Sequence, residues 1–419
     1  MSGEDWSAFR YRDFALACWA RFLVSFAIQM QTVAIGWLIY DVTGSAFALG
    51  FLGLAGFLPT ISLALVTGLV ADRCERRLIL AITSAAMALS AAGLLWHVWS
   101  GAASVWPVYV LVAAYATARS FFQPASQAIL PNLVPLHHFG QAVAFASGVH
   151  QVATIAGPAI GGLLYALDAR LPFALSLLSL AGAALAMLAI RYRDARSDHE
   201  PMTWKSLLAG LEFTMRRPVL LGAVTLDMFA VILASAVALL PIFAKDILQV
   251  GPWGLGLLRS APAVGALAMA MLLSRTSLVS RRAGPRLFTT VAFYGAATIG
   301  FGLSENFFLS MFCLAAIGAS DMVSVVIRMT IMQADTPDEL RGRVAAVNSL
   351  FITTSNEIGQ LEAGVLAGFF GAVPAVVLGG AGAIAIAGTW AWLFPDLRRR
   401  DHLVGEGSEP PWPSARRNL

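Results

Sequence analysis

Two long apolar segments are joined by the stretch Gly68-Leu69-Val70-Ala71-Asp72-Arg73-Cys74-Glu75-Arg76-Arg77. The flanking segments, residues 46–70 and 78–99, are each long enough to cross a bilayer, because a spanning helix needs about 20 apolar residues. The charged residues are confined to the short stretch between them. We therefore interpret this stretch as a turn that lies in water at one membrane surface and joins two transmembrane helices.

The same pattern of apolar segments and short polar turns extends over the whole chain. Of its 419 residues, 58% are apolar and only 12% are charged, whereas a soluble domain is roughly 45–50% apolar and about 25% charged. We predict an all-α membrane protein with twelve transmembrane helices. They are expected at residues 14–40, 46–70, 78–99, 104–123, 141–166, 171–190, 219–243, 253–274, 286–304, 307–328, 343–370 and 374–395.

Positive charge is concentrated on one side of the predicted spans. Most of the 28 Lys and Arg residues fall in the termini and the even-numbered connections, and the loops of the other side hold only Arg170 and Lys245. By the positive-inside rule, both termini are cytoplasmic. The sequence thus predicts a multi-pass protein of the bacterial inner membrane that contacts membrane lipid. Because the basic residues are dispersed among spans, no nucleic-acid partner is expected.

The second half of the sequence repeats landmarks of the first at an offset of 202 residues. Pro135 falls on Pro337, Gly157 on Gly359 and Gly162 on Gly364. We expect an N-terminal six-helix bundle (residues 1–190), a cytoplasmic linker (191–218), a C-terminal six-helix bundle (219–397) and a disordered cytoplasmic tail (398–419). Two parallel six-span halves around a central site are a known transporter architecture.

The stretch at 68–77 resembles the signature loop of the major facilitator superfamily: a Gly, Asp-Arg four residues later, then a basic pair. Three other stretches resemble one branch of it, the transmembrane secretion effector family of enterobactin-exporter-like and macrolide-efflux-like proteins. They are residues 41–45, residues 121–125, which follow the fourth predicted span, and residues 359–364. The resemblance implies two pseudo-symmetric six-helix bundles and a secondary active transporter. It also implies proton-coupled export, by alternating access, of an amphipathic or hydrophobic small molecule, either a siderophore-like metabolite or a drug.

The resemblance also assigns roles to two motifs. The signature loop implies a conformational latch that closes the cytoplasmic side, formed by Gly68, Asp72, Arg73, Arg76 and Arg77 with Arg119 as the partner. Glu75 departs from the family pattern, which often has Gly there. A second motif resembles the antiporter signature of exporters: Gly157, Pro158, Gly161 and Gly162. Proline removes a helix hydrogen bond and glycine allows close packing, so this span is expected to bend.

Charged side chains inside spans are the candidates for proton coupling. Such a charge costs about 2.5–3.5 kcal/mol at mid-bilayer, so it usually faces water or a partner. The candidates are Asp227, Asp321, Glu357 and Glu362. Glu357 and Glu362 lie on opposite helix faces and cannot enter the same cavity. Glu362 lies in the stretch that resembles the family, and the choice between Glu362 and Asp321 stays open.

Polar residues that share helix faces are the candidates for lining a substrate cavity. They are Arg21, Ser25, Gln29 and Thr32 in the first span, Gln151 and Thr154 in the fifth, and Asn348 and Ser355 in the eleventh. Two alternatives stay open. Arg21 could instead reach the lipid headgroups. His150, which lies beside the polar face of the fifth span, could serve packing alone or titrate near neutral pH.

No motif for catalysis or cofactor binding is present in the sequence. It has no HExxH, GxSxG or Walker motif, and its three cysteines have no metal-ligand spacing. We expect no enzyme activity, catalytic residue, metal or cofactor. The expected partners are a small-molecule substrate and protons, with the protein a monomer. The alternatives are a uniporter or importer of a small metabolite, and a membrane sensor on the same scaffold.

Overall fold

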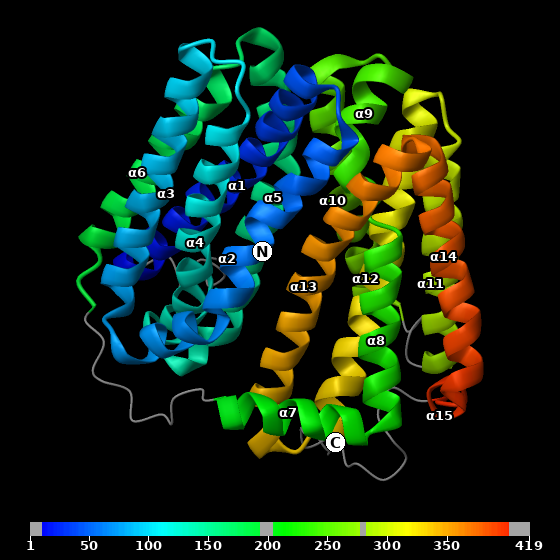
Figure 1. Cartoon of the computed structure of the whole chain (residues 1–419). Helices are drawn as coiled ribbons and strands as arrows, with labels where there is room; N and C mark the ends of the chain where they lie inside the picture. The colour runs from blue at the N-terminus through cyan, green and yellow to red at the C-terminus, as the bar shows by residue number, and fades with distance from the viewer. Residues whose placement is uncertain (1–10, 193–203, 277–281, 402–419) are drawn as a thin grey trace.

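The computed structural model describes residues 11–192, 204–276 and 282–401, and within these ranges it contains helices and no strands. The long helices form two groups that stand side by side (Figure 1). Asp72 lies in a helix, but its side chain is outside the described part of the structure.

The first group contains the helices of the N-terminal half. They are α1 (Arg12–Thr43), α2 (Ala46–Arg73), α3 (Arg76–Trp99), α4 (Trp106–Ile129), α5 (Phe139–Leu167) and α6 (Leu171–Ala189), with 3₁₀ turns η2 (Leu130–Asn132) and η3 (Leu136–His138) between α4 and α5. The turns are short. Gly44, for example, ends α1 in the left-handed conformation, with its N–H bonded to the Tyr40 carbonyl.

The second group follows the helix α7 (Trp204–Arg216), which crosses the lower end of this group in Figure 1. It begins with a broken helical segment: α8 (Pro218–Leu233), the 3₁₀ turn η4 (Ala236–Leu239), α9 (Leu240–Ile242) and the π-helical turn η5 (Phe243–Ile247). It continues with α10 (Gly251–Arg275), α11 (Ala283–Gly302), α12 (Phe307–Asp335), α13 (Asp338–Phe370), α14 (Ala372–Leu393) and the short α15 (Pro395–Arg398).

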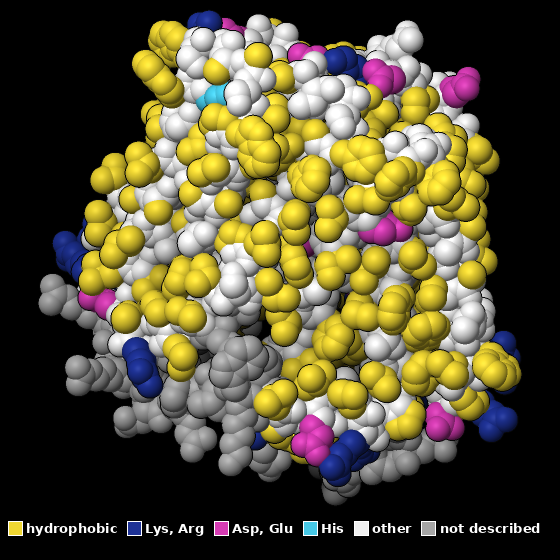
Figure 2. Space-filling view, viewed as in Figure 1, with side chains coloured by type: hydrophobic (Ala, Val, Ile, Leu, Met, Phe, Trp, Pro, Cys, Tyr) yellow, Lys and Arg dark blue, Asp and Glu magenta, His cyan; other side chains and the backbone are white. Residues whose placement is uncertain are grey.

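The surface of the helix assembly fits a lipid environment. Nine helical segments of the described chain are long and apolar enough to cross a membrane. Large apolar side chains project outward from them, including Leu89, Phe312 and Trp392, each at least 70% exposed. Hydrophobic side chains cover most of the middle of the face in Figure 2. Exposed apolar area of this extent is stable in lipid but not in water.

The helix pairings within the first group recur within the second. In the first, α1 packs on α5 and α6, α3 on α4 and α6, and α2 on α4. In the second, α8 packs on α13 and α14, α11 on α12 and α14, and α10 on α12. Each pairing of the first group therefore has a counterpart in the second, in agreement with the internal repeat of the sequence.

Two sequence predictions of helix limits are wrong. The segment predicted to be one helix at 219–243 is broken at Ser235, whose backbone leaves the helical region, and Pro241 lacks the N–H that a continuous helix needs. Residues 121–125, expected to follow the fourth span, lie inside α4, which runs through Pro124 to Ile129. Proline is tolerated inside membrane helices because neighbouring groups satisfy the freed carbonyl.

Candidate functional site

Two helix pairs form most of the contact between the two groups, α2 with α13 and α5 with α10, and α1 also contacts α9 and α10. The α2–α13 contact uses a glycine stripe on α2: Gly50, Gly53 and Gly56. A Cβ on Gly53 would lie 2.8 Å from the Cβ of Gln360, and one on Gly50 would lie 3.2 Å from the Cα of Gly364. The absence of side chains therefore allows the two backbones to approach closely.

The α5–α10 contact uses the predicted antiporter-like motif. A Cβ on Gly162 would lie 2.8 Å from the Cα of Gly256 on α10. Gly157 and Gly161 instead pack on α1, where a Cβ on Gly161 would lie 2.9 Å from the Cα of Met30. The motif thus lies where α1, α5 and α10 meet.

Two hydrogen bonds reinforce the α5–α10 contact. The Ser260 hydroxyl donates to the Ile155 carbonyl at 2.7 Å, and the Gln151 side-chain amide donates to the Ala263 carbonyl at 2.9 Å. Gln151, predicted to contact substrate, therefore connects the two groups in this structure.

A polar clasp joins the two groups at the end of α1. The Tyr40 hydroxyl donates to Asp246, and Lys245 Nζ lies 2.7 Å from Asp41 Oδ1. Lys245 also lies over the Tyr40 ring, 5.7 Å from its centroid. We call this end of the molecule, at the top of Figure 1, the closed end.

The opposite end, which carries α7, is open between the groups. A Cβ on Gly68 of α2, Gly140 or Gly148 of α5, or Gly342 of α13 would meet no heavy atom within 4 Å. These positions lie on three of the four helices that form the contacts at the closed end. The helices α2, α5 and α13 therefore diverge from the opposite group toward the open end.

A cavity lies between the two groups beneath the closed end. It is lined by Thr32, Val33, Gly36, Leu49, Leu52, Ala238, Pro241, Leu255, Arg259 and Gln360. Thr32 was predicted to line such a cavity. Arg259 was not predicted to line it. A lone arginine inside the predicted span 253–274 could have indicated this role, as it did for Arg21.

Four charged side chains of the two groups act electrostatically on one another or on His150. Glu357 of α13 interacts electrostatically with Arg259 of α10 and with Arg119 of α4, although α4 belongs to the other group. Arg119 is exposed and Arg21 is partly buried, and both act electrostatically on His150. His150 Nδ1 and Ser25 Oγ, 3.0 Å apart, share a hydrogen bond between α5 and α1.

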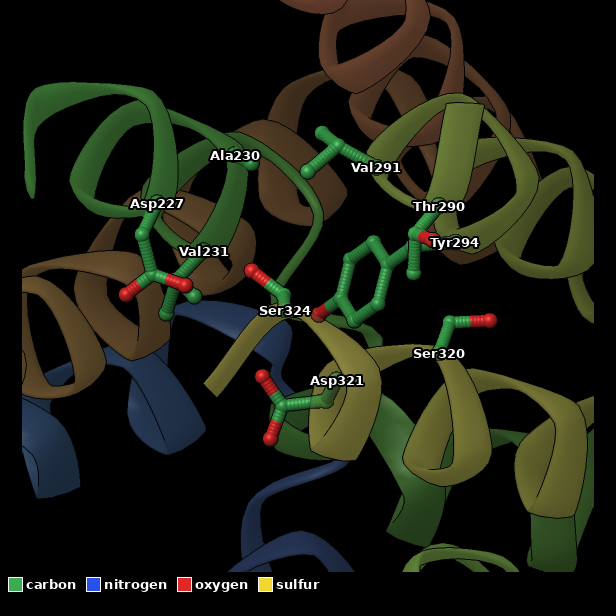
Figure 3. A pocket seen from close by; sticks show the side chains of 9 residues that line it. All are labelled: Asp227, Ala230, Val231, Thr290, Val291, Tyr294, Ser320, Asp321 and Ser324. Atoms are coloured by element: carbon green, nitrogen blue, oxygen red, sulfur yellow. The ribbon is translucent and has the colours of Figure 1, made fainter. Parts of the chain in front are cut away.

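A second polar cluster lies within the second group of helices (Figure 3). Asp227 of α8 and Arg328 of α12 form a buried ion pair, with Oδ2 and Nη1 2.7 Å apart. Asp321, Ser324 and Tyr294 line the same pocket as Asp227. Asp227 thus has an arginine partner, whereas Asp321 has no hydrogen bond or ion pair among the described residues.

Glu362 lies in a third pocket, distinct from the cavity between the groups and from the Asp227 pocket. It lines a pocket with Ser235, where the helix α8–η4 breaks, and with Val376 of α14. Its buried Oε2 has no hydrogen-bond partner in the described part of the chain. Glu357 instead faces α2, with Oε2 3.4 Å from the position of a Cβ on Gly56. The two acids are therefore separate, as predicted.

The other predicted cavity residues contact neighbouring helices or bond to carbonyls of their own helices. Gln29 packs against Gly157 of α5. The hydroxyl groups of Thr32, Thr154 and Ser355 donate to carbonyls of their own helices. Asn348 is buried, and its amide nitrogen lies 3.9 Å from the sulfur of Met329.

The signature loop lies at the open end. Arg76 Nη1 donates to the Ala128 carbonyl at 3.2 Å and Arg77 Nη1 to the Ile190 carbonyl at 2.7 Å, so both hold the ends of neighbouring helices of the first group. Glu75, the residue that departs from the family pattern, pairs with Arg77 at 3.1 Å. Arg73 is exposed. The predicted Asp72–Arg119 pairing involves a side chain outside the described part of the structure.

The paired groups of apolar helices, with a mostly apolar cavity that holds Arg259 between them, define a membrane transporter of the major facilitator type. The chain belongs to the transmembrane secretion effector family, whose sequence model matches residues 3–416. The family predicted from the sequence is thereby confirmed.

Comparisons with known proteins agree on this class. The chain is 27% identical over 390 residues to the enterobactin exporter EntS of Escherichia coli O81 (strain ED1a), covering 91% of each chain. The same values hold for EntS of Shigella boydii serotype 18. Among solved structures, a peptide transporter POT has a TM-score of 0.75 at 10% identity, covering 94% of this chain and 95% of that one. The nucleoside transporter NupG has a TM-score of 0.72 at 11% identity, covering 91% and 100%.

Proposed function

We propose that this protein is a proton-driven exporter of an amphipathic organic molecule of siderophore-like character. In this proposal, twelve spans form two six-helix bundles in the bacterial inner membrane, with both termini in the cytoplasm. The protein works as a monomer, and the bundles rock about the central cavity to give alternating access.

One observation carries the proposal: the two helix groups touch at one end and diverge at the other. The open end carries α7 and the basic loops, such as that with Arg76 and Arg77. By the positive-inside rule this end faces the cytoplasm. The cavity is then accessible from the cytoplasm and sealed from the outside, which is the state in which an exporter takes up its substrate.

The relatives support the direction of transport and the kind of substrate. EntS is an enterobactin exporter, and the chain matches it over 91% of both sequences. The apolar walls of the cavity, with Leu49, Leu52 and Leu255 beside Gln360 and Arg259, suit a molecule with an apolar body and a few polar groups.

Two carboxyl groups are the preferred proton carriers. A carrier must lose and regain its proton during the cycle, so it must not be tied to a permanent cationic partner. Asp227 is paired with Arg328, and Glu357 lies near Arg259 and Arg119. Asp321 and Glu362 form no ion pair among the described residues, and they line pockets that contain neither Arg259 nor Arg119, which makes them the better candidates.

The latch is proposed to act in the opposite state. When the open end closes, α4 and the signature loop of the first group approach α13 of the second group together, so that Asp72 and Arg119 come within reach of partners across the interface. Arg119 is exposed in the present state, so it is available for that contact.

Proton movement in everted vesicles with an energised, acid interior tests this function. A pH-sensitive dye reports proton release when siderophores, macrolides, dyes and organic acids are added one at a time. We expect release with at least one compound, and its loss in Glu362→Gln or Asp321→Asn but not in Asp338→Asn, a surface acid 81% exposed at its side chain.

Two results would argue against the proposal. Unchanged release in both Glu362→Gln and Asp321→Asn would mean that the coupling acid lies elsewhere. Compound uptake that follows only its own gradient, with no proton signal, would favour a uniporter.

A further inference from the structure

The charges of the central cavity define a class of substrate. We infer that the cavity binds an organic anion, whose negative group is held by Arg259 beneath the closed end. This inference rests on the proposed transport function and adds the charge of the transported molecule.

The space between the two groups carries an excess of positive charge. Arg259 lines the cavity. Arg21 and Arg119 act electrostatically on His150 of α5, and Glu357 is the acid in electrostatic range of Arg119 and Arg259. Three positive charges against one negative charge leave a net charge of +2. The other acids lie in separate pockets: Asp227 and Asp321 with Arg328 within the second group, and Glu362 beside the break at Ser235.

Arg259 lies near the closed end of this space. It is three residues beyond Gly256, so it lies about one helical turn below the Gly162–Gly256 crossing that seals the cavity. Its neighbours in the lining are the apolar Leu52 and Leu255 and the amide-bearing Gln360. A molecule that enters from the open end therefore meets Arg259 last.

Arg259 has no ion-pair partner in the structure as described. Glu357 is near enough to act on it electrostatically, but no carboxylate of the described residues lies within 4 Å of its guanidinium group. A partly buried charge without a partner is costly. A bound anion removes this cost, and the planar guanidinium presents paired N–H donors that match the two oxygens of a carboxylate or a catecholate.

The same charges disfavour cationic substrates. An amine that enters from the open end approaches Arg119 and Arg21 before it reaches Arg259, and each like charge raises its energy in a partly buried space. Of the two substrate classes that the sequence leaves open, acidic siderophore-like metabolites fit this cavity, and basic drugs such as macrolides do not.

Binding to the purified full-length protein in lipid nanodiscs, measured by calorimetry, tests the inference. The probes are 2-naphthoate, its methyl ester and 2-naphthylmethylamine, which share one aromatic body and differ in charge. We expect the carboxylate to bind most tightly. Arg259→Gln should weaken carboxylate binding about tenfold or more without weakening ester binding, because it removes a charge-assisted hydrogen bond. Arg259→Lys, which keeps the charge, should restore part of the affinity.

Arg275→Gln is the matched control, because Arg275 lies on the same helix at its exposed end. It should leave all three affinities unchanged. The inference is overturned if the carboxylate does not bind, if the amine binds as tightly, or if Arg259→Gln weakens carboxylate and ester equally. An amine that drives proton release in everted vesicles would overturn this inference while leaving the proposed export function intact.

Discussion

Gly256→Ala should open the closed end. A Cβ at this position would lie 2.4 Å from the Pro158 carbonyl oxygen and 3.0 Å from the Cα of Gly162. Because carbon–oxygen contacts are normally about 3.3 Å or longer, α5 and α10 must separate by about 0.9 Å to admit one methyl group. Overpacking of this kind costs about 1–3 kcal/mol.

This cost applies in only one of the two states. When α5 and α10 separate at the closed end, the added methyl group meets no neighbour, so the strain disappears. The ratio of molecules open at this end to molecules closed there should therefore rise by about 5- to 150-fold.

Labelling of a cysteine in the cavity measures this ratio. Leu52→Cys, in a chain whose three native cysteines are replaced, places a thiol in the cavity beneath the closed end. A membrane-impermeant maleimide added from the outside reaches this thiol only when the closed end opens. We expect the labelling rate to rise with Gly256→Ala in proportion to the open population.

Gly388→Ala is the control, because a Cβ at Gly388 of α14 meets no atom within 4 Å. It should leave the labelling rate unchanged. If Gly256→Ala folds normally and labels at the wild-type rate, the Gly162–Gly256 contact does not hold this end closed, and the reasoning is wrong.

Three further predictions concern the ion pairs and the latch. Asp227→Asn should lower the free energy of unfolding by about 3–5 kcal/mol in a chemical denaturation experiment, because it leaves Arg328 buried without a partner. Glu212→Gln, which breaks an exposed pair with Arg216, should lower it by about 1 kcal/mol or less. Equal losses in the two variants would contradict the stabilising role of the buried pair. Lys245→Ala should raise maleimide labelling from the outside by about fivefold at most, since the Lys245–Asp41 pair is partly exposed, and a decrease would refute the clasp. Asp72→Asn should slow the initial transport rate in everted vesicles, and an unchanged rate would show that the latch assignment is wrong.

The sequence predicted the class of fold because lipid imposes strict rules on a chain. Long apolar segments, the one-sided distribution of arginine and the repeat around Gly157 and Gly359 are each visible without coordinates. The break at Ser235 was not predicted, although Pro241 is visible in the sequence, because proline also occurs inside continuous membrane helices such as α4. It depends on tertiary contacts, such as the bond from the Tyr294 hydroxyl to the Ala234 carbonyl at 3.3 Å.

The candidate site was predicted less completely. Helix periodicity correctly separated Glu357 from Glu362, because the facing direction of a side chain follows from its position on one helix. It did not identify the clasp of Tyr40 and Asp41 with Lys245 and Asp246, whose partners are about 205 residues apart in the sequence. Pairings of that kind depend on how the two groups of helices meet, which no local pattern encodes.

Alternating access is the central claim, and distances measured by electron paramagnetic resonance between spin labels at both ends test it most directly. One pair, Ala102→Cys and Glu305→Cys, reports on the closed end, and a second pair, His137→Cys and Arg341→Cys, reports on the open end. All four positions are exposed. We predict that Gly256→Ala lengthens the first distance and shortens the second. If the two distances change in the same direction, or only the first one changes, the two ends are not coupled and the account is contradicted.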